Sequence, residues 1–329
     1  MTPRQPPDLA AVPVLVTGGS GFIGSHLVEE LVARGARVRV LDDHSTGPAR
    51  NLAGVSDRIE LEVGDIRDLA TCHAASRGCR FVFHQAARGS VPRSLEDPAA
   101  SLAVNVQGTA NVFAAAREAG VERVVYASSS SVYGDSPRLP RREGEEGEPM
   151  SPYALSKVMG EQIARVFSRC YGLPSIGLRY FNVYGPRQDP EGPYAAVIPR
   201  FFGARLGGET PRIHGDGRQS RDFTWVGDVV AANLLALTAD GADGGAVNVA
   251  SGRRTTILEL DRRIAELTGG GPAAVHGPPR PGDVAHAHAD LTRAARQLGF
   301  TPGVDLSQGL ARALDHYRER LAAVGGDRR

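Results

Sequence analysis

Short runs of aliphatic and β-branched residues alternate with longer amphipathic stretches through the first half of the chain. The runs have the length and composition of strands and cover residues 13–19, 37–43, 58–66, 80–87 and 122–129. Residues 22–35 repeat apolar side chains at helical spacing, and a second, alanine-rich helix is predicted at about residues 99–119. This alternation is typical of right-handed βαβ units, whose parallel sheet is covered by helices on both faces.

The second half of the chain begins regularly and then changes character. Helices are predicted over residues 153–172, 228–239, 256–269 and 305–324, and a further buried strand over residues 175–185. The polar, acidic segment 141–149 is expected to be a solvated loop. From about residue 186 proline and glycine become denser, which indicates a second, smaller lobe. Asp305 is the expected N-cap of the last helix, which has one apolar face and is predicted to pack on the rest of the protein.

The composition argues against several classes of function. The 329 residues include 38 basic and 37 acidic side chains, a formal net charge of +1, which disfavours a dedicated nucleic-acid binder or a polybasic membrane-surface protein. No run approaches the ~18 consecutive apolar residues that a membrane helix needs, and the first residues lack a secretory pattern, so we expect a cytoplasmic protein. Cys72, Cys79 and Cys170 match no metal or redox spacing and are expected to be reduced thiols.

Arginine supplies all but one of the basic side chains, and the single lysine is Lys157. An ammonium is compact and its pKa is tunable, whereas a guanidinium is planar and always charged. The lone lysine therefore draws attention to its position.

Three glycines, Gly18, Gly21 and Gly24, lie between the first strand and the first helix with the spacing GxxGxxG. Glycines at such a turn let the backbone approach a diphosphate, and the helix N-terminus supplies N–H donors and a positive dipole end. Asp42 ends the second strand, 18 residues beyond Gly24, close to the roughly 20 expected for an acid that binds the adenosine ribose. Because a carboxylate there repels a 2′-phosphate, the pattern predicts NAD rather than NADP.

Tyr153 and Lys157 form the pattern Y-x-x-x-K on a predicted helix, so the two side chains share one face. A free phenol has a pKa of ~10 and is a poor base at neutral pH, but a nearby ammonium stabilises the phenolate and lowers that pKa. Four serines, residues 128–131, follow the strand 122–129 at the carboxyl end of the sheet, where open α/β sheets bind ligands. A hydroxyl there is suited to pass a substrate proton to Tyr153.

These features lie within the motifs TGGSGFIG, LDDHSTG, HQAARGSVPRS, ASSSSVYG, SPYALSK and RYFNVYGPRQDP. Over nearly its whole length the chain resembles the extended short-chain dehydrogenase/reductases. Within them it is most similar to the NAD-dependent nucleotide-sugar epimerase/dehydratase family, and there to the 4-epimerases of the UDP-GlcNAc and UDP-glucuronate type.

The resemblance implies a Rossmann-type, doubly wound parallel α/β sheet with a smaller C-terminal α/β substrate lobe. The NAD-binding domain is expected over residues 1–180, with about 221–252 crossing back, and the nucleotide-sugar lobe over about 181–220 and 253–329. The resemblance also implies a homodimer that forms through two helices of each subunit, here those at 99–119 and 153–172.

The resemblance further implies roles for individual residues. The catalytic residues are Ser129, Tyr153 and Lys157. The cofactor contacts are Gly18, Gly21, Phe22, Ile23, Gly24, Asp42, Ser45, Gly47, Asp65, Ile66, Gln85, Ala86, Ala87, Tyr153, Lys157, Tyr180 and Val183. The contacts to the UDP-sugar are Ser90, Ser129, Ser130, Tyr153, Asn182, Gln188, Ala196, Val197, Arg200, His214, Arg221, Arg280, Asp283 and Ala287. No metal site is expected, because His286 and His288 come without further ligands.

The reaction that the resemblance implies is C4 epimerisation of a UDP-sugar. Tyr153, assisted by Ser129, takes the proton of the sugar 4-OH while hydride leaves C4 for NAD. The 4-keto sugar then receives the hydride on its other face. Ser130 and Ser131 stand where dehydratases of the family carry Asp-Glu, so the acid pair that removes water is missing.

Several alternatives remain open. Ala287 stands where a bulky tyrosine closes the pocket of members restricted to glucose and galactose, which favours UDP-GlcNAc and UDP-GalNAc. UDP-glucuronate, whose carboxylate needs a partner such as Arg88 or Arg187, and UDP-glucose are the alternative substrates. The alternative functions are a dehydratase or reductase of the same family and a non-catalytic NAD-sensing regulator.

Overall fold

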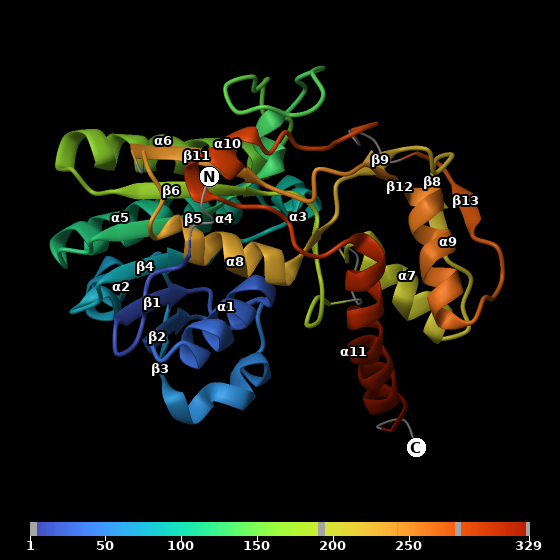
Figure 1. Ribbon diagram of the computed structural model, residues 1–329, viewed down its shortest axis with the longest axis horizontal. Helices are drawn as coiled ribbons and strands as arrows, with labels where there is room; N and C mark the ends of the chain where they lie inside the picture. The colour runs from blue at the N-terminus through green and yellow to red at the C-terminus, as the bar shows by residue number, and fades with distance from the viewer. Residues whose placement is uncertain (1–4, 190–194, 242, 280–283, 327–329) are drawn as a thin grey trace.

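The computed structural model describes residues 5–189, 195–241, 243–279 and 284–326. Within these ranges seven parallel strands form one central sheet in the order β11-β6-β5-β4-β1-β2-β3 (Figure 1). The strands are β1 (Pro13–Thr17), β2 (Arg37–Asp42), β3 (Ile59–Val63), β4 (Phe81–His84), β5 (Arg123–Ser129), β6 (Ser175–Tyr180) and β11 (Asp243–Val249). From β1 the chain first adds β2 and β3 on one side and then β4, β5, β6 and β11 on the other. The connections that leave β1 and β4 therefore run to opposite sides, which leaves a crevice at the carboxyl ends of these two strands. The predicted doubly wound sheet is confirmed.

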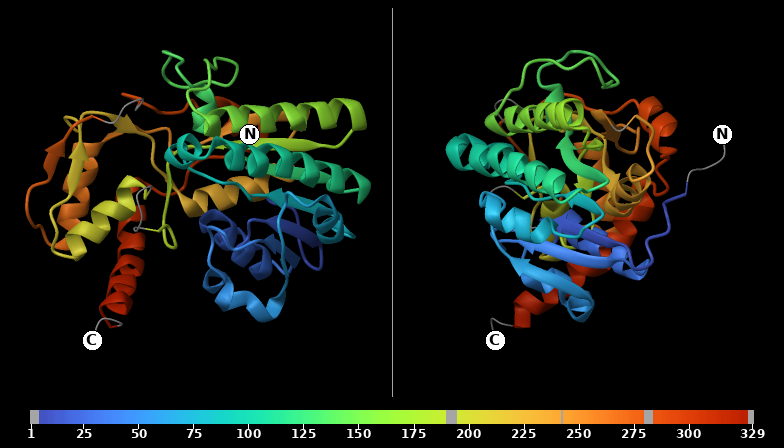
Figure 2. Two further views of the ribbon diagram at one scale, coloured as in Figure 1. Left: turned by 180° about the vertical axis from the view of Figure 1, so that it is seen from behind. Right: turned by 90° about the vertical axis from the view of Figure 1, so that its left-hand side faces the viewer.

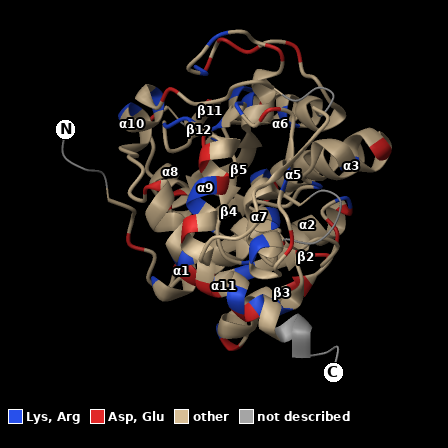
Figure 3. Cartoon of the chain, turned by 90° about the vertical axis from the view of Figure 1, so that its right-hand side faces the viewer, with Lys and Arg blue, Asp and Glu red and all other residues tan. Residues whose placement is uncertain are grey.

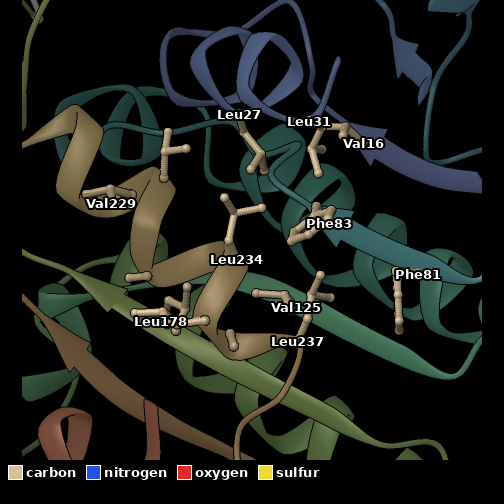
Figure 4. Packing of buried hydrophobic residues seen from close by; sticks show 14 of the residues in the cluster. Val16, Leu27, Leu31, Phe81, Phe83, Val125, Leu178, Val229, Leu234 and Leu237 are labelled. Atoms are coloured by element: carbon tan, nitrogen blue, oxygen red, sulfur yellow. The ribbon is translucent and has the colours of Figure 1, made fainter. Parts of the chain in front are cut away.

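Helices cover both faces of the sheet (Figure 2). One face carries α1 (Phe22–Ala33), α8 (Val226–Ala236) and α10 (Thr292–Leu298), and the other carries α2 (Leu69–Ser76), α5 (Thr109–Glu118) and α6 (Pro152–Tyr171). Alternate residues of β1 explain the double cover: Val14 and Val16 belong to the core beneath α1 and α8, and Leu15 to the core beneath α2 and α5. Figure 4 shows the first of these cores, in which Leu27 and Leu31 of α1 lie near Phe83. Strands buried on both faces read as continuous apolar runs, as this sequence does.

The predicted helix at 99–119 is not one regular helix. It consists of α4 (Pro98–Leu102), a π-helical segment over Ala103–Gly108, and α5. Asn105 lies in the π-helical segment, where its amide bonds to the backbone of Arg88 and to the Ser156 hydroxyl. An extra residue in a turn widens a helix locally and re-aims its side chains, and these long-range bonds stabilise the departure from regular geometry.

Two other expectations about local structure are wrong in detail. The predicted strand 175–185 ends at Tyr180, and after Asn182, whose φ is +32°, the short β7 (Val183–Tyr184) pairs with β10 (Thr224–Trp225) outside the main sheet. The acidic segment 141–149 is not simply solvated: the Arg141 residue is 6% exposed and the Glu143 side chain 5% exposed. Glu143 Oε1 accepts a hydrogen bond from Asn248 N at 2.7 Å, so backbone donors at the sheet draw the segment inward.

The second lobe stands beside the sheet and is built on its own apolar core. It contains α7 (Val197–Leu206), α9 (Ile257–Thr268), α11 (Leu306–Gly326) and two small sheets, formed by β8 (Arg212–His214) with β13 (Val275–Gly277) and by β9 (Ser220–Arg221) with β12 (Thr255–Thr256). The predicted last helix is confirmed: Leu310, Leu314 and Tyr317 are buried, and Asp305 Oδ1 accepts from Gln308 N at 2.9 Å.

The chain crosses back to the sheet once more than the predicted boundaries allow. Helix α8 and strand β11 lie within residues 221–252, the segment predicted to cross back. However, Ala294 and Leu298 of α10, followed by Phe300, belong to the core beneath α1 and α8. Residues 292–300 therefore pack on the core of the central sheet, although the predicted boundaries assign them to the second lobe.

Charges of both signs are interspersed along α9 and α11 on the face of the second lobe (Figure 3). Among the described residues no helix combines the length and the apolar content required to cross a membrane.

Candidate active site

A cavity of about 820 Å³ follows the carboxyl ends of the central strands. Its wall begins at the turn between β1 and α1, passes the ends of β2, β3 and β4, and reaches Tyr153 and Lys157 on α6. Every residue predicted to contact the cofactor lines this cavity except Gly47 and Val183. Gly47 supports the wall from behind, because a Cβ there would lie 2.5 Å from Gly21 N. Val183 lies in β7.

The glycine turn brings backbone unusually close to backbone. Gly18 has φ +70°, and a Cβ on it would lie 2.5 Å from Ala86 N. A Cβ on Gly24 would overlap the carbonyl oxygen of Gly18. Helix α1 begins directly after Gly21, so its free N–H groups and its positive dipole end are presented at the cavity. This narrow cradle, which side chains would fill, suits the diphosphate of a dinucleotide.

Asp42 ends β2 on the cavity wall and is 7% exposed. Its two carboxylate oxygens accept hydrogen bonds from Ser20 N at 2.9 Å and His44 N at 2.8 Å. Burial raises the pKa of Asp42, and the two backbone donors oppose that rise. Each carboxylate oxygen keeps a lone pair for a ribose hydroxyl, which fits the predicted role in binding NAD.

The three predicted catalytic residues come together where β5 meets α6. Ser151 caps α6 by accepting from Ala154 N at 3.1 Å, and Pro152 is the first helical residue. Lys157 Nζ donates to the carbonyl oxygen of Ala127 at 2.9 Å and lies 5.9 Å from the centroid of the Tyr153 ring. The side chain of Ser129 hydrogen-bonds to the Tyr153 phenol and also accepts from Ser131 N at 3.1 Å.

Burial acts on both titratable groups of this pair. It lowers the pKa of Lys157 to about 8, with Glu161 acting in the opposite direction. Burial raises the pKa of Tyr153, and the hydrogen bond from Ser129 is the influence that lowers it. The sequence predicts that the charge of Lys157 lowers this pKa. The Lys157 ammonium donates to the Ala127 carbonyl and lies on the same helical face as the phenol.

Unlike the cofactor contacts, most of the predicted sugar contacts do not line the cavity. Tyr153 and Gln188 line the cavity. Ser90, Ser129 and Ser130 do not, and the hydroxyl of Ser90 instead caps α3 (Val91–Glu96), accepting from Arg93 N at 3.3 Å. Arg280 and Asp283 lie outside the described residues.

The remaining predicted sugar contacts lie in or beside the second lobe, outside the cavity wall. Three segments there are adjacent: Asn182 Nδ2 donates to Asp222 O at 3.3 Å, next to Arg221, and Ala287 N donates to Ser220 O at 3.1 Å. Val197 and Arg200 lie on α7, Ala196 caps that helix, and His214 ends β8. His286 Nδ1 and Ser220 Oγ form a hydrogen bond of 2.9 Å, which joins the segment around His286 to β9. Among the described residues, no three His, Cys, Asp or Glu side chains gather as metal ligands would.

The sequence analysis did not predict a buried hydrogen-bond network near Tyr153 and Lys157. His84 bonds to Thr17 Oγ1 at 2.7 Å and to Thr109 Oγ1 at 2.9 Å, and burial lowers its pKa to about 3, so its ring is neutral. Asn105 joins the network by donating to Ser156 Oγ at 3.0 Å, and that hydroxyl donates to Tyr153 O. The sequence signal for such a network is a polar residue at a position that the helix or strand pattern assigns to the core, because a buried polar group needs a hydrogen-bond partner.

Arg88 and Arg187, the predicted partners for the carboxylate of UDP-glucuronate, differ in position. Arg88 lines the cavity and Arg187 does not; Arg187 forms an ion pair with Glu29 of α1.

Known proteins match this arrangement. A profile described as "NAD dependent epimerase/dehydratase family" matches residues 14–250. A UDP-glucose 4-epimerase of Mycolicibacterium smegmatis is 43% identical over 310 residues, which cover 93% of this chain and 98% of that protein. The structure of a UDP-N-acetylglucosamine 4-epimerase of Methanobrevibacter ruminantium, in complex with UDP-N-acetylmuramic acid, has a TM-score of 0.91 at 37% identity and covers 94% of this chain and 99% of that chain. For the Thermus thermophilus UDP-glucose 4-epimerase in complex with NAD, the TM-score is 0.85 at 39% identity, with coverage of 93% and 99%.

Proposed function

The chain belongs to the NAD-dependent epimerase/dehydratase family, and on that premise we propose that it inverts C4 of a UDP-sugar. The observation that carries the proposal is the grouping of Ser129, Tyr153 and Lys157 where β5 meets α6, at the end of a cavity that begins at the glycine turn. One end of that cavity suits a dinucleotide diphosphate. The other end is lined by the Tyr153 phenol and the Lys157 ammonium, with the Ser129 hydroxyl beside the phenol, and together these groups can move a proton.

NAD, when bound, would supply reversible hydride transfer at the sugar C4. The glycine turn and the N-terminus of α1 would hold its diphosphate, and Asp42 its adenosine ribose. The Tyr153 phenolate accepts the proton of the sugar 4-OH, and the Ser129 hydroxyl orients that oxygen. Lys157 supplies a fixed positive charge that stabilises the phenolate. When the hydride returns, Tyr153 gives the proton back.

Two serines favour epimerisation over dehydration. Dehydration requires an acid and a base that act on carbons beside C4, and the residues after Ser129 are Ser130 and Ser131. A hydroxyl titrates far above neutral pH and cannot replace a carboxylic acid. A reductase of the same fold and an NAD-sensing regulator are the alternatives, and the Tyr153–Lys157 pair weighs against the regulator.

The sugar that we propose is the N-acetylhexosamine of UDP-GlcNAc and UDP-GalNAc. Ala287 contributes only a methyl group, and its backbone is held by Ser220, so this position leaves space for a bulky substituent. UDP-glucose and UDP-glucuronate are the alternative substrates. The test is product analysis by NMR after incubation with UDP-GlcNAc, UDP-GlcA and UDP-Glc separately. C4 epimer from UDP-GlcNAc without net NADH release is expected; consumption of added NAD(P)H would identify a reductase, and no product from any sugar would indicate a sensor.

We also propose a homodimer in which α6 contributes to the interface. Leu155, Met159 and Val166 leave 39–51% of their surface exposed on this helix, and their spacing places them along one side of it. Light scattering at micromolar concentration is expected to give twice the mass of the chain, and a single-chain mass would contradict the proposal.

The pH dependence of turnover follows from Lys157. Because burial lowers its pKa to about 8, the ammonium is present below that pH and is lost as the pH rises through it. We therefore expect kcat/KM to fall above about pH 8, measured between pH 6 and pH 10. Lys157→Arg is the matched variant. We expect it to turn over more slowly than wild type, but its guanidinium stays charged at every pH tested. The decline of kcat/KM near pH 8 should therefore be absent in this variant. A decline at the same pH in both proteins would show that another group titrates.

A further inference from the structure

A third buried polar residue follows Tyr153 and Lys157 along α6. Glu161 comes four residues after Lys157, so the three side chains occupy successive turns of one helical face. Glu161 is 4% exposed, and the proposed chemistry does not use it. A carboxylate is rarely buried so deeply unless it is paired.

The partners of Glu161 come from two strands and one loop. Ser128 Oγ at the end of β5 donates to Glu161 Oε1 at 2.6 Å. Arg179 of β6 donates to both carboxylate oxygens, through Nε at 2.9 Å and through Nη2 at 2.7 Å. The third guanidinium nitrogen pairs with Glu146 of the segment 141–149, and the guanidinium carbon lies 5.0 Å from the centroid of the Tyr133 ring. A bidentate pair of this kind fixes the carboxylate in one orientation.

Ser128 connects this network to the reacting groups. It stands between Ala127, whose carbonyl oxygen accepts from Lys157 Nζ, and Ser129, whose hydroxyl bonds to Tyr153. The strand end that positions both catalytic partners is therefore held to Glu161 by one short hydrogen bond.

We propose that Glu161 is a positioning residue: it keeps the Lys157 ammonium charged and, through Ser128, holds the end of β5 against α6. Arg179 and Glu146 fix the orientation of the carboxylate. The consequence for turnover rests on the proposed function, whereas the effect on Lys157 does not.

The charges that face Lys157 are consistent with this role. On α6 they are Tyr153 and Glu161; on β4 there is His84, whose ring is neutral; on β6 Arg179 lies behind Glu161 and Tyr180 lines the cavity. Glu161 lies one helical turn beyond Lys157 on the same face of α6, and its carboxylate stabilises the ammonium against the burial that disfavours it.

The experiment uses the fact that Lys157 is the chain's only lysine. In protein labelled with [ε-13C]lysine and carrying no lysine in a tag, one resonance reports the titration of Lys157 directly. In Glu161→Gln we expect the pKa of Lys157 to fall by about one unit, because a neighbouring anion is lost. Asp261→Asn is the matched control, since it removes the carboxylate that pairs with Arg205, another buried arginine, in the second lobe. It should leave the Lys157 titration unchanged.

A second readout tests the link through Ser128. Ser128→Ala removes the hydrogen bond without unpairing the Glu161 charge from Arg179, so this variant should fold. We expect its kcat to fall about tenfold or more, with KM for the UDP-sugar much less changed, because misplacement of reacting groups costs turnover. If Glu161→Gln does not fold, Glu161→Asp gives the same titration test with a smaller shift, because its charge lies one methylene further away.

The outcomes separate the two proposals. A folded Glu161→Gln protein whose Lys157 titrates as in wild type would reduce Glu161 to a structural ion pair. A lowered Lys157 pKa, in a wild-type protein that converts no UDP-sugar, would support the role of Glu161 and contradict the proposed function.

Discussion

Tyr153→Phe is expected to abolish turnover while leaving NAD bound. The variant keeps the ring that lines the cavity and removes the oxygen that we propose exchanges a proton with the sugar 4-OH. Loss of a positioned general base typically costs 10²- to 10⁴-fold, and we expect about 10³-fold or more in kcat. The measurement is epimerisation of the UDP-sugar by NMR, alongside the NAD content of the purified protein after denaturation.

Tyr126→Phe is the matched control for this loss. Its phenol is buried in the same sheet and donates to Gly244 O at 2.9 Å, but the residue does not line the cavity. Its removal should cost about 1 kcal/mol of stability, as for an ordinary hydrogen bond, and little activity. Substantial epimerase activity in Tyr153→Phe would refute the assignment of the base, and equal losses in both variants would indicate damage to the sheet instead.

Gly24→Ala is expected to damage both the fold and the binding of NAD. Gly24 lies in the first turn of α1, and a Cβ there would overlap the Gly18 carbonyl oxygen. The backbone of the turn must move apart, and the cradle for the diphosphate opens with it. We expect a loss of about 3 kcal/mol in the free energy of unfolding, at the upper end for overpacking, together with loss of bound NAD. Thermal unfolding and NAD content measure the two effects.

Gly160→Ala provides the comparison. Gly160 is also a buried helical glycine, but a Cβ there would meet no atom within 4 Å beyond its own helix. Since alanine favours a helix by about 1 kcal/mol over glycine, this variant should be as stable as wild type or slightly more stable. Were Gly24→Ala to keep its NAD and its unfolding temperature, the close approach at the turn would have no functional importance.

The features that the sequence predicts well are local. Three such features are the glycine turn, the acid at the end of β2 and the Tyr153–Lys157 pair. Each depends on a few residues at fixed spacing in the sequence. Because the backbone between them is a regular strand or helix, that spacing fixes their relative positions in the structure. The alternation of strands and helices predicts the doubly wound sheet for the same reason. Its hydrophobic periods are set by geometry that repeats every two or 3.6 residues.

The segment 141–149 illustrates where local reasoning fails. Its charged residues indicate a solvated loop, yet Glu143 bonds to the backbone of Asn248 and Glu146 pairs with Arg179. These partners are far away in sequence and become neighbours only once β6 and β11 lie side by side in the sheet. No periodicity within nine residues contains that information.

By itself the sequence determined the fold class, and it predicted the cofactor turn and the roles that we propose for Ser129, Tyr153 and Lys157. The tertiary structure alone decided the π-helical segment around Asn105, the return of α10 to the first core, and the pairing of Glu161 with Arg179. It also decided the directions of the pKa shifts of Tyr153 and Lys157. The reason is physical: burial and charge act through space, and the groups that surround a side chain come from elements that only folding brings together.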